Sequence, residues 1–251
     1  MEPIIIAFAM YSKIPVPNVE WSDKNMRYAL SFLPLIGIVT GIGFYILYYI
    51  CTSLEFAGTL KGAILTAVPI LITGGIHADG YIDTVDAYLS FAEREKRLEI
   101  LKDPHVGAFA VIYAILYFML YAGFASEIGT SGIHMVCAGF VTSRSLSGIG
   151  ALTVKKAKSN GLLHGFTEKA VKNKSVLILS FFFIASAGYV MFFSVLNGAA
   201  LLIVSAAVFL YYRNFAVKNF GGATGDLAGY FLQIYELSVL IVAVVLEKAA
   251  V

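Results

Sequence analysis

Three aspartates follow one another at helical spacing in the segment 73–86. Asp79, Asp83 and Asp86 are separated by four and then three residues. On an α-helix, which turns about 100° per residue, these spacings place the three carboxylates within an arc of roughly 60°. Clustered carboxylates repel one another unless a cation lies among them, and such hard oxygen ligands suit Mg²⁺, with Mn²⁺ as the alternative. The sequence therefore predicts a metal site at these aspartates.

Two neighbours of the aspartates have chemistry of their own. Gly80 leaves the backbone bare where a large ligand could approach. His77 could bind the metal, take a proton or form a hydrogen bond at the interface, although on a helix it points away from the three carboxylates. The alternative for the whole segment is an acidic helix face that merely touches water. Apolar neighbours disfavour that alternative, because they hold the helix in or against the membrane, where unpaired carboxylates are costly.

A second segment with an aspartate, 219–226, precedes the last apolar run. Its glycine-rich turn leads into a predicted helix, so free backbone N–H groups and a positive dipole end favour an anion such as phosphate. The residues expected to bind it are Gly221, Gly222, Thr224 and Gly225. Asp226 could hold a second ion beside them. The alternative for these glycines is a flexible hinge or close helix packing.

Four further charged residues could contact a substrate. Arg144 and Glu236 lie inside predicted membrane spans, where each is costly unless paired. The sequence leaves two roles open for them, a structural ion pair between helices and a part in binding substrate. Lys102 and Asp103 lie at the membrane end of an amphipathic helix predicted from Glu93 to Pro104, where they could reach the site.

The elements that must position these residues are membrane helices. Of the 251 residues 59% are hydrophobic and only 14% are charged, against about 25% charged in an average soluble domain. An ordinary soluble domain is excluded, and a net charge of +2 indicates no nucleic-acid partner. We predict an all-α, polytopic integral membrane protein with about seven transmembrane helices. They lie near 28–50, 57–76, 105–125, 132–152, 175–194, 196–212 and 229–246, in one membrane-embedded domain over 1–251 that opens with an interfacial or re-entrant arm at 1–27.

The lysines and arginines predict how the chain is oriented. Fifteen of the 18 lie in the arm and in the loops after the second, fourth and sixth spans. Since such loops stay in the cytoplasm, we predict a cytoplasmic amino terminus, an external carboxyl terminus and a site that faces the cytoplasm from the cell membrane. The lysine-rich loop at 155–174 is consistent with anionic lipid or a phosphorylated substrate. Asn197-Gly198 predicts the turn between the fifth and sixth spans.

Both aspartate segments therefore lie on one side of the membrane, and both have the form Gly-Gly-x-x-x-Asp. A diphosphate needs more positive potential than one ion or one helix end supplies. We expect the two segments to build one site, with roughly 5 to 10 Å between the carboxylates of Asp79 and Asp226.

Four ordered motifs resemble those of the cobalamin synthase family, the adenosylcobinamide-GDP ribazoletransferases or cobalamin-5′-phosphate synthases. Segment 74–86 resembles the family's Gly-Gly-x-His-x-Asp-Gly-x-x-Asp-Thr-x-Asp, and 13–17 its Arg-Ile-Pro-Val-Pro. Segment 98–107 resembles its Leu-x-Ile-Met-Lys-Asp-x-x-x-Gly, and 221–226 its Gly-Gly-x-Thr-Gly-Asp. The chain departs from the family at Lys13, where arginine is usual, and at Lys156-Ala-Lys-Ser-Asn-Gly161, where many members have Ala-Arg-Pro-x-Gly.

The resemblance implies the last assembly step of cobamide biosynthesis. α-Ribazole or its 5′-phosphate attacks adenosylcobinamide-GDP through the ribose 3′-hydroxyl, GMP leaves, and adenosylcobalamin or its 5′-phosphate forms. It also implies a divalent cation, usually Mg²⁺. We expect the metal on Asp79, Asp83, Asp86 and Asp226, with His77, Asp79 and Asp83 as the catalytic residues. Substrate contacts are expected from Lys13, Gly80, Lys102, Asp103, Arg144, Gly221, Gly222, Thr224 and Gly225.

Two other functions stay open at this stage. One is a different Mg²⁺-dependent membrane phosphotransferase of the CDP-alcohol type, which also uses spaced aspartates. The other is a cation-coupled transporter, which would place its carboxylates near the membrane midplane rather than at one face. Besides the two substrates, membrane lipid is an expected partner, and a homo-oligomer is left open.

Overall fold

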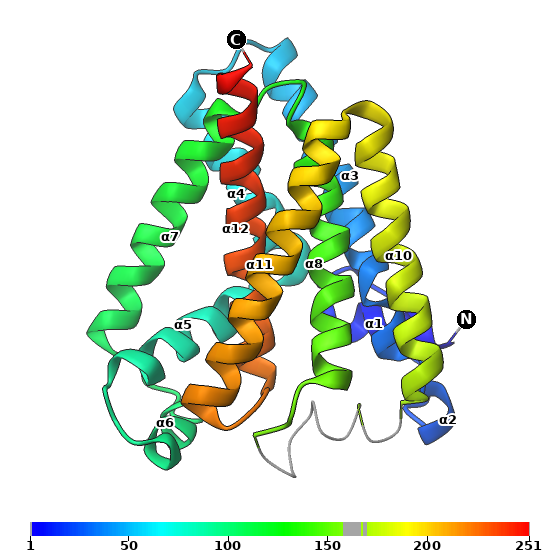
Figure 1. Cartoon of the computed structure of the whole chain (residues 1–251), viewed down its shortest axis with the longest axis vertical. Coiled ribbons are helices and arrows are strands. Elements are labelled where there is room, and N and C mark those ends of the chain that lie inside the picture. The colour runs from blue at the N-terminus through cyan, green and yellow to red at the C-terminus, as the bar shows by residue number, and fades with distance from the viewer. Residues whose placement is uncertain (1, 158–166, 168–169, 251) are drawn as a thin grey trace.

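The computed structural model describes residues 2–157, 167 and 170–250, and there the named elements are all helices (Figure 1). Their order is α1 (Glu2–Tyr11), α2 (Asp23–Met26), the 3-10 helix η1 (Ala29–Phe32), α3 (Leu33–Ser53), α4 (Gly58–Thr73), α5 (Ile76–Leu89), α6 (Arg94–Ile100), α7 (Ala108–Glu127), α8 (Ile133–Thr153), α10 (Lys172–Phe193), α11 (Val195–Phe220) and α12 (Gly225–Ala249).

The long helices are apolar enough to cross a membrane. In the described part of the chain, six helical stretches are long and apolar enough to be candidate membrane spans. They are residues 23–53, which include α3, and the helices α7, α8, α10, α11 and α12. The pair α4 and α5 makes a seventh when it is counted as one span. The prediction of an all-α polytopic membrane protein with about seven spans is confirmed. The short apolar helix α1 belongs to the arm that precedes them.

The second span is not a straight helix. Gly74 and Gly75 both have positive φ angles, 68° and 79°, a left-handed conformation that glycine adopts at little cost. They end α4 at Thr73, and the chain then turns by 97° into α5. Of the two halves of this bent span, α4 is therefore the half that runs within the membrane. Helix α5 leads away from α4 toward α6 at one end of the bundle (Figure 1).

The turn between the fifth and sixth spans lies three residues before its predicted position. Ser194 has an extended backbone and its hydroxyl accepts a hydrogen bond from the Asn197 backbone N–H at 3.2 Å. Ser194 thus caps α11, while Asn197 and Gly198 lie in its first turn, so the prediction of a turn at Asn197-Gly198 is wrong. Gly198 is needed for packing instead, because a Cβ there would lie 2.9 Å from the Met191 Cα.

Helix α11 is also longer than the span predicted at 196–212. It continues to Phe220, so Arg213 and Lys218 lie in its last turns and not in a loop. The amphipathic helix predicted before Pro104 is shorter than expected, since α6 ends at Ile100.

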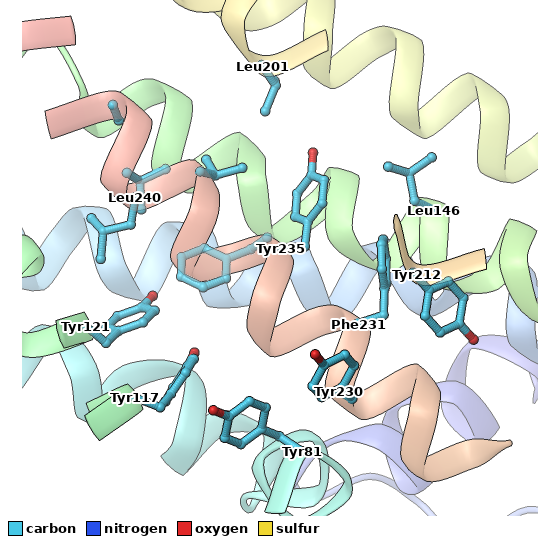
Figure 2. Close-up of a cluster of buried hydrophobic side chains, with 14 of the residues drawn as sticks. Tyr81, Tyr117, Tyr121, Leu146, Leu201, Tyr212, Tyr230, Phe231, Tyr235 and Leu240 are labelled. Atoms are coloured by element: carbon cyan, nitrogen blue, oxygen red, sulfur yellow. The ribbon is translucent and has the colours of Figure 1, made fainter. Parts of the chain in front are cut away.

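Helix α8 is the centre of the bundle. In its most apolar 18-residue stretch, 83% of the residues are buried inside the protein. The corresponding share is 22% in α7 and 17% in α10. It packs against α3, α10, α11 and α12. Beside it, side chains of α5, α7 and α12 form an aromatic core that includes Tyr81, Tyr117 and Tyr230 (Figure 2). The outward surfaces of α7 and α10 are left apolar and exposed.

Within the bundle a buried ion pair joins α8 to α12. Arg144 Nη1 donates to Glu236 Oε1 at 2.7 Å, and Ser143 Oγ donates to the same oxygen at 2.9 Å. Arg144 is fully buried and Glu236 is 5% exposed. Of the two roles that the sequence left open for these residues, the structure shows the ion pair, which compensates two charges that would be costly alone in an apolar medium.

The ion pair yields a stability prediction. Arg144→Leu or Glu236→Leu leaves a buried charge without its partner, so we expect each to lower the free energy of unfolding by roughly 3–5 kcal/mol. The double variant should regain most of that loss, because no uncompensated charge remains. Thermal unfolding of the detergent-solubilised protein measures the cycle. Single variants as stable as the original chain would contradict the prediction.

Candidate functional site

Helix α5 presents its aspartates on the face that does not pack. His77, Gly80 and Tyr81 are buried against the bundle, whereas Asp79 is exposed and Asp83 is half-buried. The predicted helix over this segment is confirmed, and with it the common face for the carboxylates.

The first turn of α12 lies directly against α5. A Cβ on Gly80 would come within 2.8 Å of the Asp226 carbonyl oxygen and 2.9 Å of its Cα. A Cβ on Gly229 would lie 2.9 Å from the His77 carbonyl oxygen. Only residues without a Cβ allow the two backbones to approach this closely. The two Gly-Gly-x-x-x-Asp segments are therefore brought together, as expected from the sequence.

This contact changes the interpretation of Gly80. The sequence predicted that the glycine leaves room for a substrate. The backbone of Asp226 occupies that space, so Gly80 is required for helix packing instead.

The carboxylates of the two segments act on one another. Burial, and after it the charges of Asp79, Asp226 and Asp86, raise the pKa of Asp83 from 3.8 to about 6. Four acids thus lie within electrostatic reach of one another: Asp79, Asp83 and Asp86 on α5, beyond the bend that ends α4, and Asp226 in the first turn of α12. Among the described residues, however, no three side chains of His, Cys, Asp or Glu converge as a preformed metal site.

Asp86 has a structural contact as well. Its Oδ2 accepts a hydrogen bond from the Gly107 backbone N–H at 3.2 Å, and Gly107 is the N-cap of α7. The carboxylate thereby satisfies one of the free N–H groups at the start of that helix.

A cavity of about 520 Å³ opens beside the aspartates. Lys13, Gly74, Gly75 and Asp79 are among its lining residues. The Lys13 side chain lies over Gly74, and its backbone N–H donates to the Ile72 carbonyl at 2.8 Å. The cavity therefore has a cation and a carboxylate in its lining, and its volume is in the range of ligand-binding pockets.

The glycine-rich turn before α12 pairs with the chain that follows α8. Ala223 donates to the Lys155 carbonyl at 2.7 Å, and Ala157 donates to the Ala223 carbonyl at 3.1 Å. Gly222 has a φ of 154°, and a Cβ there would come within 2.6 Å of the Ala157 nitrogen. The start of the lysine-rich loop is thus held beside this turn. Residues 158–166 and 168–169 of that loop lie outside the described residues.

Thr224 begins α12 as its N-cap. Its hydroxyl accepts from the Leu227 backbone N–H at 3.2 Å. Gly225 is exposed in the first turn of the helix.

Two arginines of α6 lie beside the glycine-rich turn before α12. The sequence analysis did not identify them as site residues. A Cβ on Gly221 would lie 3.2 Å from Arg94 Cδ. Arg97 donates to Asn219 Oδ1 at 3.2 Å, and its guanidinium lies 5.3 Å from the centre of the Tyr88 ring. Their spacing of three residues, which puts both on one helical face, was the available signal.

Four of the expected site residues have surroundings of their own. Lys102 and Asp103 are exposed in the turn after α6, where Asp103 accepts from the His105 backbone N–H at 3.0 Å. His77 and Arg144 are buried inside the bundle, and the His77 ring stacks on Tyr11 at 6.4 Å. His77 thus points away from the aspartates, as its helical position indicated.

The raised pKa of Asp83 predicts how the metal-free protein responds to pH. Its folded form holds the proton more tightly than the unfolded chain, so stability falls as pH rises from about 4 to about 6. Asp83→Asn removes this loss. We expect it to stabilise the metal-free protein at pH 7.5 by on the order of 1 kcal/mol, a small value because water screens the half-buried carboxylate.

Unfolding temperatures across pH 4 to 8, with a chelator present, test this expectation. Glu20→Gln, a change of an exposed acid in the amino-terminal arm, is the control. A destabilised Asp83→Asn protein would instead indicate that the carboxylate has a structural partner.

Comparison with known proteins shows the family of this chain. The chain is 43% identical to the adenosylcobinamide-GDP ribazoletransferase of Lachnoclostridium phytofermentans, over 96% of this chain and 93% of that protein. It is 31% identical to the protein of that name from Clostridium botulinum strain Alaska E43, over 93% of each chain. No solved structure matches it. The family model described as cobalamin-5-phosphate synthase matches residues 3–244, and the chain belongs to this family.

Proposed function

We propose that this protein joins adenosylcobinamide-GDP to α-ribazole or α-ribazole 5′-phosphate, releases GMP and forms adenosylcobalamin or its 5′-phosphate. The observation that carries the proposal is the contact between α5 and α12, which gathers Asp79, Asp83 and Asp226 beside a cavity that Lys13 also lines. The name of the similar proteins supports the choice of substrates.

The reaction is a displacement at phosphorus. The ribose 3′-oxygen forms a bond to the phosphorus that carries cobinamide, and the bond from that phosphorus to the bridging oxygen of GMP breaks. GMP leaves with the bridging oxygen, and the hydroxyl proton passes to a base. Such a step depends mainly on placing the groups in line and on compensating negative charge.

We propose Mg²⁺, with Mn²⁺ as the alternative, as the cofactor held by Asp79, Asp83 and Asp226. Their oxygens have the right chemistry, and their mutual repulsion favours a cation among them. The lack of a preformed site of three side chains is compatible with Mg²⁺, which usually takes only one or two carboxylates together with phosphate and water. When bound, the ion would neutralise the diphosphate and stabilise the departing GMP.

The chain's own cations would bind the rest of the diphosphate. Lys13 extends over Gly74 in the 520 Å³ cavity, and Arg94 lies at Gly221 beside the start of α12. The N-terminus of α12 adds backbone N–H groups and a positive dipole end. Together these groups would hold the phosphates while the hydroxyl approaches.

Either Asp79 or Asp83 can accept the proton of the attacking hydroxyl. The carboxylate that does not bind the cation is the better candidate, because a bound cation lowers the pKa of its ligand and weakens it as a base. His77 is buried on the opposite side of α5, which disfavours it as the base.

Activity of the purified full chain tests the proposed function. Incubation with adenosylcobinamide-GDP, α-ribazole and Mg²⁺ should release GMP, and chelation of the metal should stop it. Asp79→Asn and Asp83→Asn should each lower kcat at least about 100-fold, because each removes charge from the site without changing its size. Glu20→Gln should keep full activity.

Other outcomes separate the alternatives. Release of CMP from a CDP-alcohol would favour the other type of membrane phosphotransferase. Folded protein that releases no nucleotide, but moves a cation across a vesicle membrane, would favour the transporter. Helix α5 and the start of α12, which carry the aspartates, lie toward the same end of the bundle as α6 (Figure 1), and this placement disfavours the transporter.

We further propose that the site faces the cytoplasm from the cell membrane, with lipid around the exposed apolar sides of α7 and α10. Helices α2 and α6 and the turn between α11 and α12 lie at one end of the bundle, and the carboxyl terminus lies at the other (Figure 1). The segments rich in lysine and arginine are thus gathered at the end with the aspartates. Positive loops stay in the cytoplasm.

The orientation has its own test. A reporter fused after Val251 should be detected outside the cell, and one inserted near Lys158 should be detected in the cytoplasm. The opposite result for both reporters would invert the proposed orientation, and two cytoplasmic reporters would mean that one span does not cross.

A further inference from the structure

Three side chains with an unpaired buried polar atom line one small cavity behind the site. The atoms are His77 Nε2, the Tyr121 hydroxyl oxygen and Arg144 Nε, and none has a hydrogen-bond partner among the described residues. Their residues are 6%, 2% and 0% exposed. All three line the same small cavity. The space in it that the centre of a water molecule can occupy has a volume of about 10 Å³.

The size and chemistry of this cavity select its ligand. A space of about 10 to 15 Å³ on this measure holds a single water. Arg144 Nε–H can only donate, whereas the Tyr121 hydroxyl and the His77 ring can donate or accept, so one water can satisfy all three. A charged ligand is disfavoured, because the Arg144 guanidinium is already compensated by Glu236. A buried polar atom left without a hydrogen bond destabilises the fold, so a water that bonds to all three is favoured.

We propose that this cavity is a binding site for one internal water molecule, which bridges His77 of α5, Tyr121 of α7 and Arg144 of α8. The water would connect the first turn of α5 to the buried ion pair between α8 and α12. It would thereby bind together the helices that carry the two aspartate segments.

The site gives His77 a positioning role. Thr73, Gly75 and Ala78 line both the small cavity and the 520 Å³ cavity with Lys13 and Asp79. The first turn of α5 is thus the wall between them, with His77 facing inward and Asp79 outward. A hydrogen bond to His77 restrains the rotation of this turn and so fixes the direction of Asp79. This role in activity rests on the proposed function, whereas the water site does not.

Hydroxyl-radical labelling of the full chain in nanodiscs tests the water site directly, because radiolysis of a bound water oxidises the side chains around it. Tyr235 is the matched control, since it is also fully buried but its hydroxyl is bonded to Ser205 and Thr142. We expect Tyr121 to be oxidised at least about threefold faster than Tyr235. Equal rates in the unaltered protein would overturn the proposal.

Variants at His77 test the bridge. His77→Phe removes the ring nitrogens, and we expect Tyr121 oxidation to fall to the rate of Tyr235. His77→Gln keeps a polar group and should retain most of the labelling. If His77→Phe fails to fold, the comparison of tyrosines in the unaltered protein still decides the question. Undiminished labelling in a folded His77→Phe protein would overturn the bridge.

Turnover separates positioning from catalysis. His77→Gln should keep activity within about tenfold of the original chain, with an unchanged pH profile, whereas His77→Phe should lose more. A pH profile that changes shape in His77→Gln would make His77 the base and overturn the positioning role. If neither the original chain nor any variant releases GMP, the proposed function is wrong. The labelling experiment still tests the water site, because it does not depend on activity.

Discussion

The close approach of two backbones at Gly80 and Gly229 is the constraint on which the site depends. Helices α5 and α12 touch there without intervening side chains, and a single added Cβ at Gly80 would meet the backbone of Asp226. Backbone atoms cannot move aside as a flexible side chain can, so a larger residue must push the helices apart. Residues separated by more than a hundred positions in the chain share one site because this contact is so short.

The same contact creates an electrostatic problem that the protein must balance. It places Asp226 near the aspartates of α5, where burial, and after it the charges of Asp79, Asp226 and Asp86, raise the pKa of Asp83 to about 6. Basic residues lie close to this cluster, since Lys13 of the amino-terminal arm lines the same cavity as Asp79, and Arg94 of α6 lies at Gly221. A site with clustered carboxylates and nearby cations is suited to a charged substrate that arrives with its own counter-ion.

Sequence reasoning found the spans and the aspartate face because both depend on local chemistry. Apolar runs of sufficient length must become membrane helices, and spacings of four and three residues must share a helical face. For Arg144 and Glu236 it left open an ion pair or a part in binding substrate, and the structure shows that the two side chains pair. The position of the turn between the fifth and sixth spans was predicted wrongly, because a glycine can serve either a turn or close packing. Asn197-Gly198 indicated a turn, whereas Ser194 forms the cap and Gly198 serves packing against Met191.

The sequence by itself thus determined the class of fold and the family, and it identified Asp79 and Asp83 as the candidates for the chemistry. Only the tertiary structure decided what lies opposite each residue. Gly80 was expected to make room for a substrate, but the crossing of α12 fills that space. Arg94 and Arg97 gained a place at the glycine-rich turn because α6 packs against α11. Spacing along a chain determines which side chains share a face, whereas the partner of that face depends on how distant helices cross.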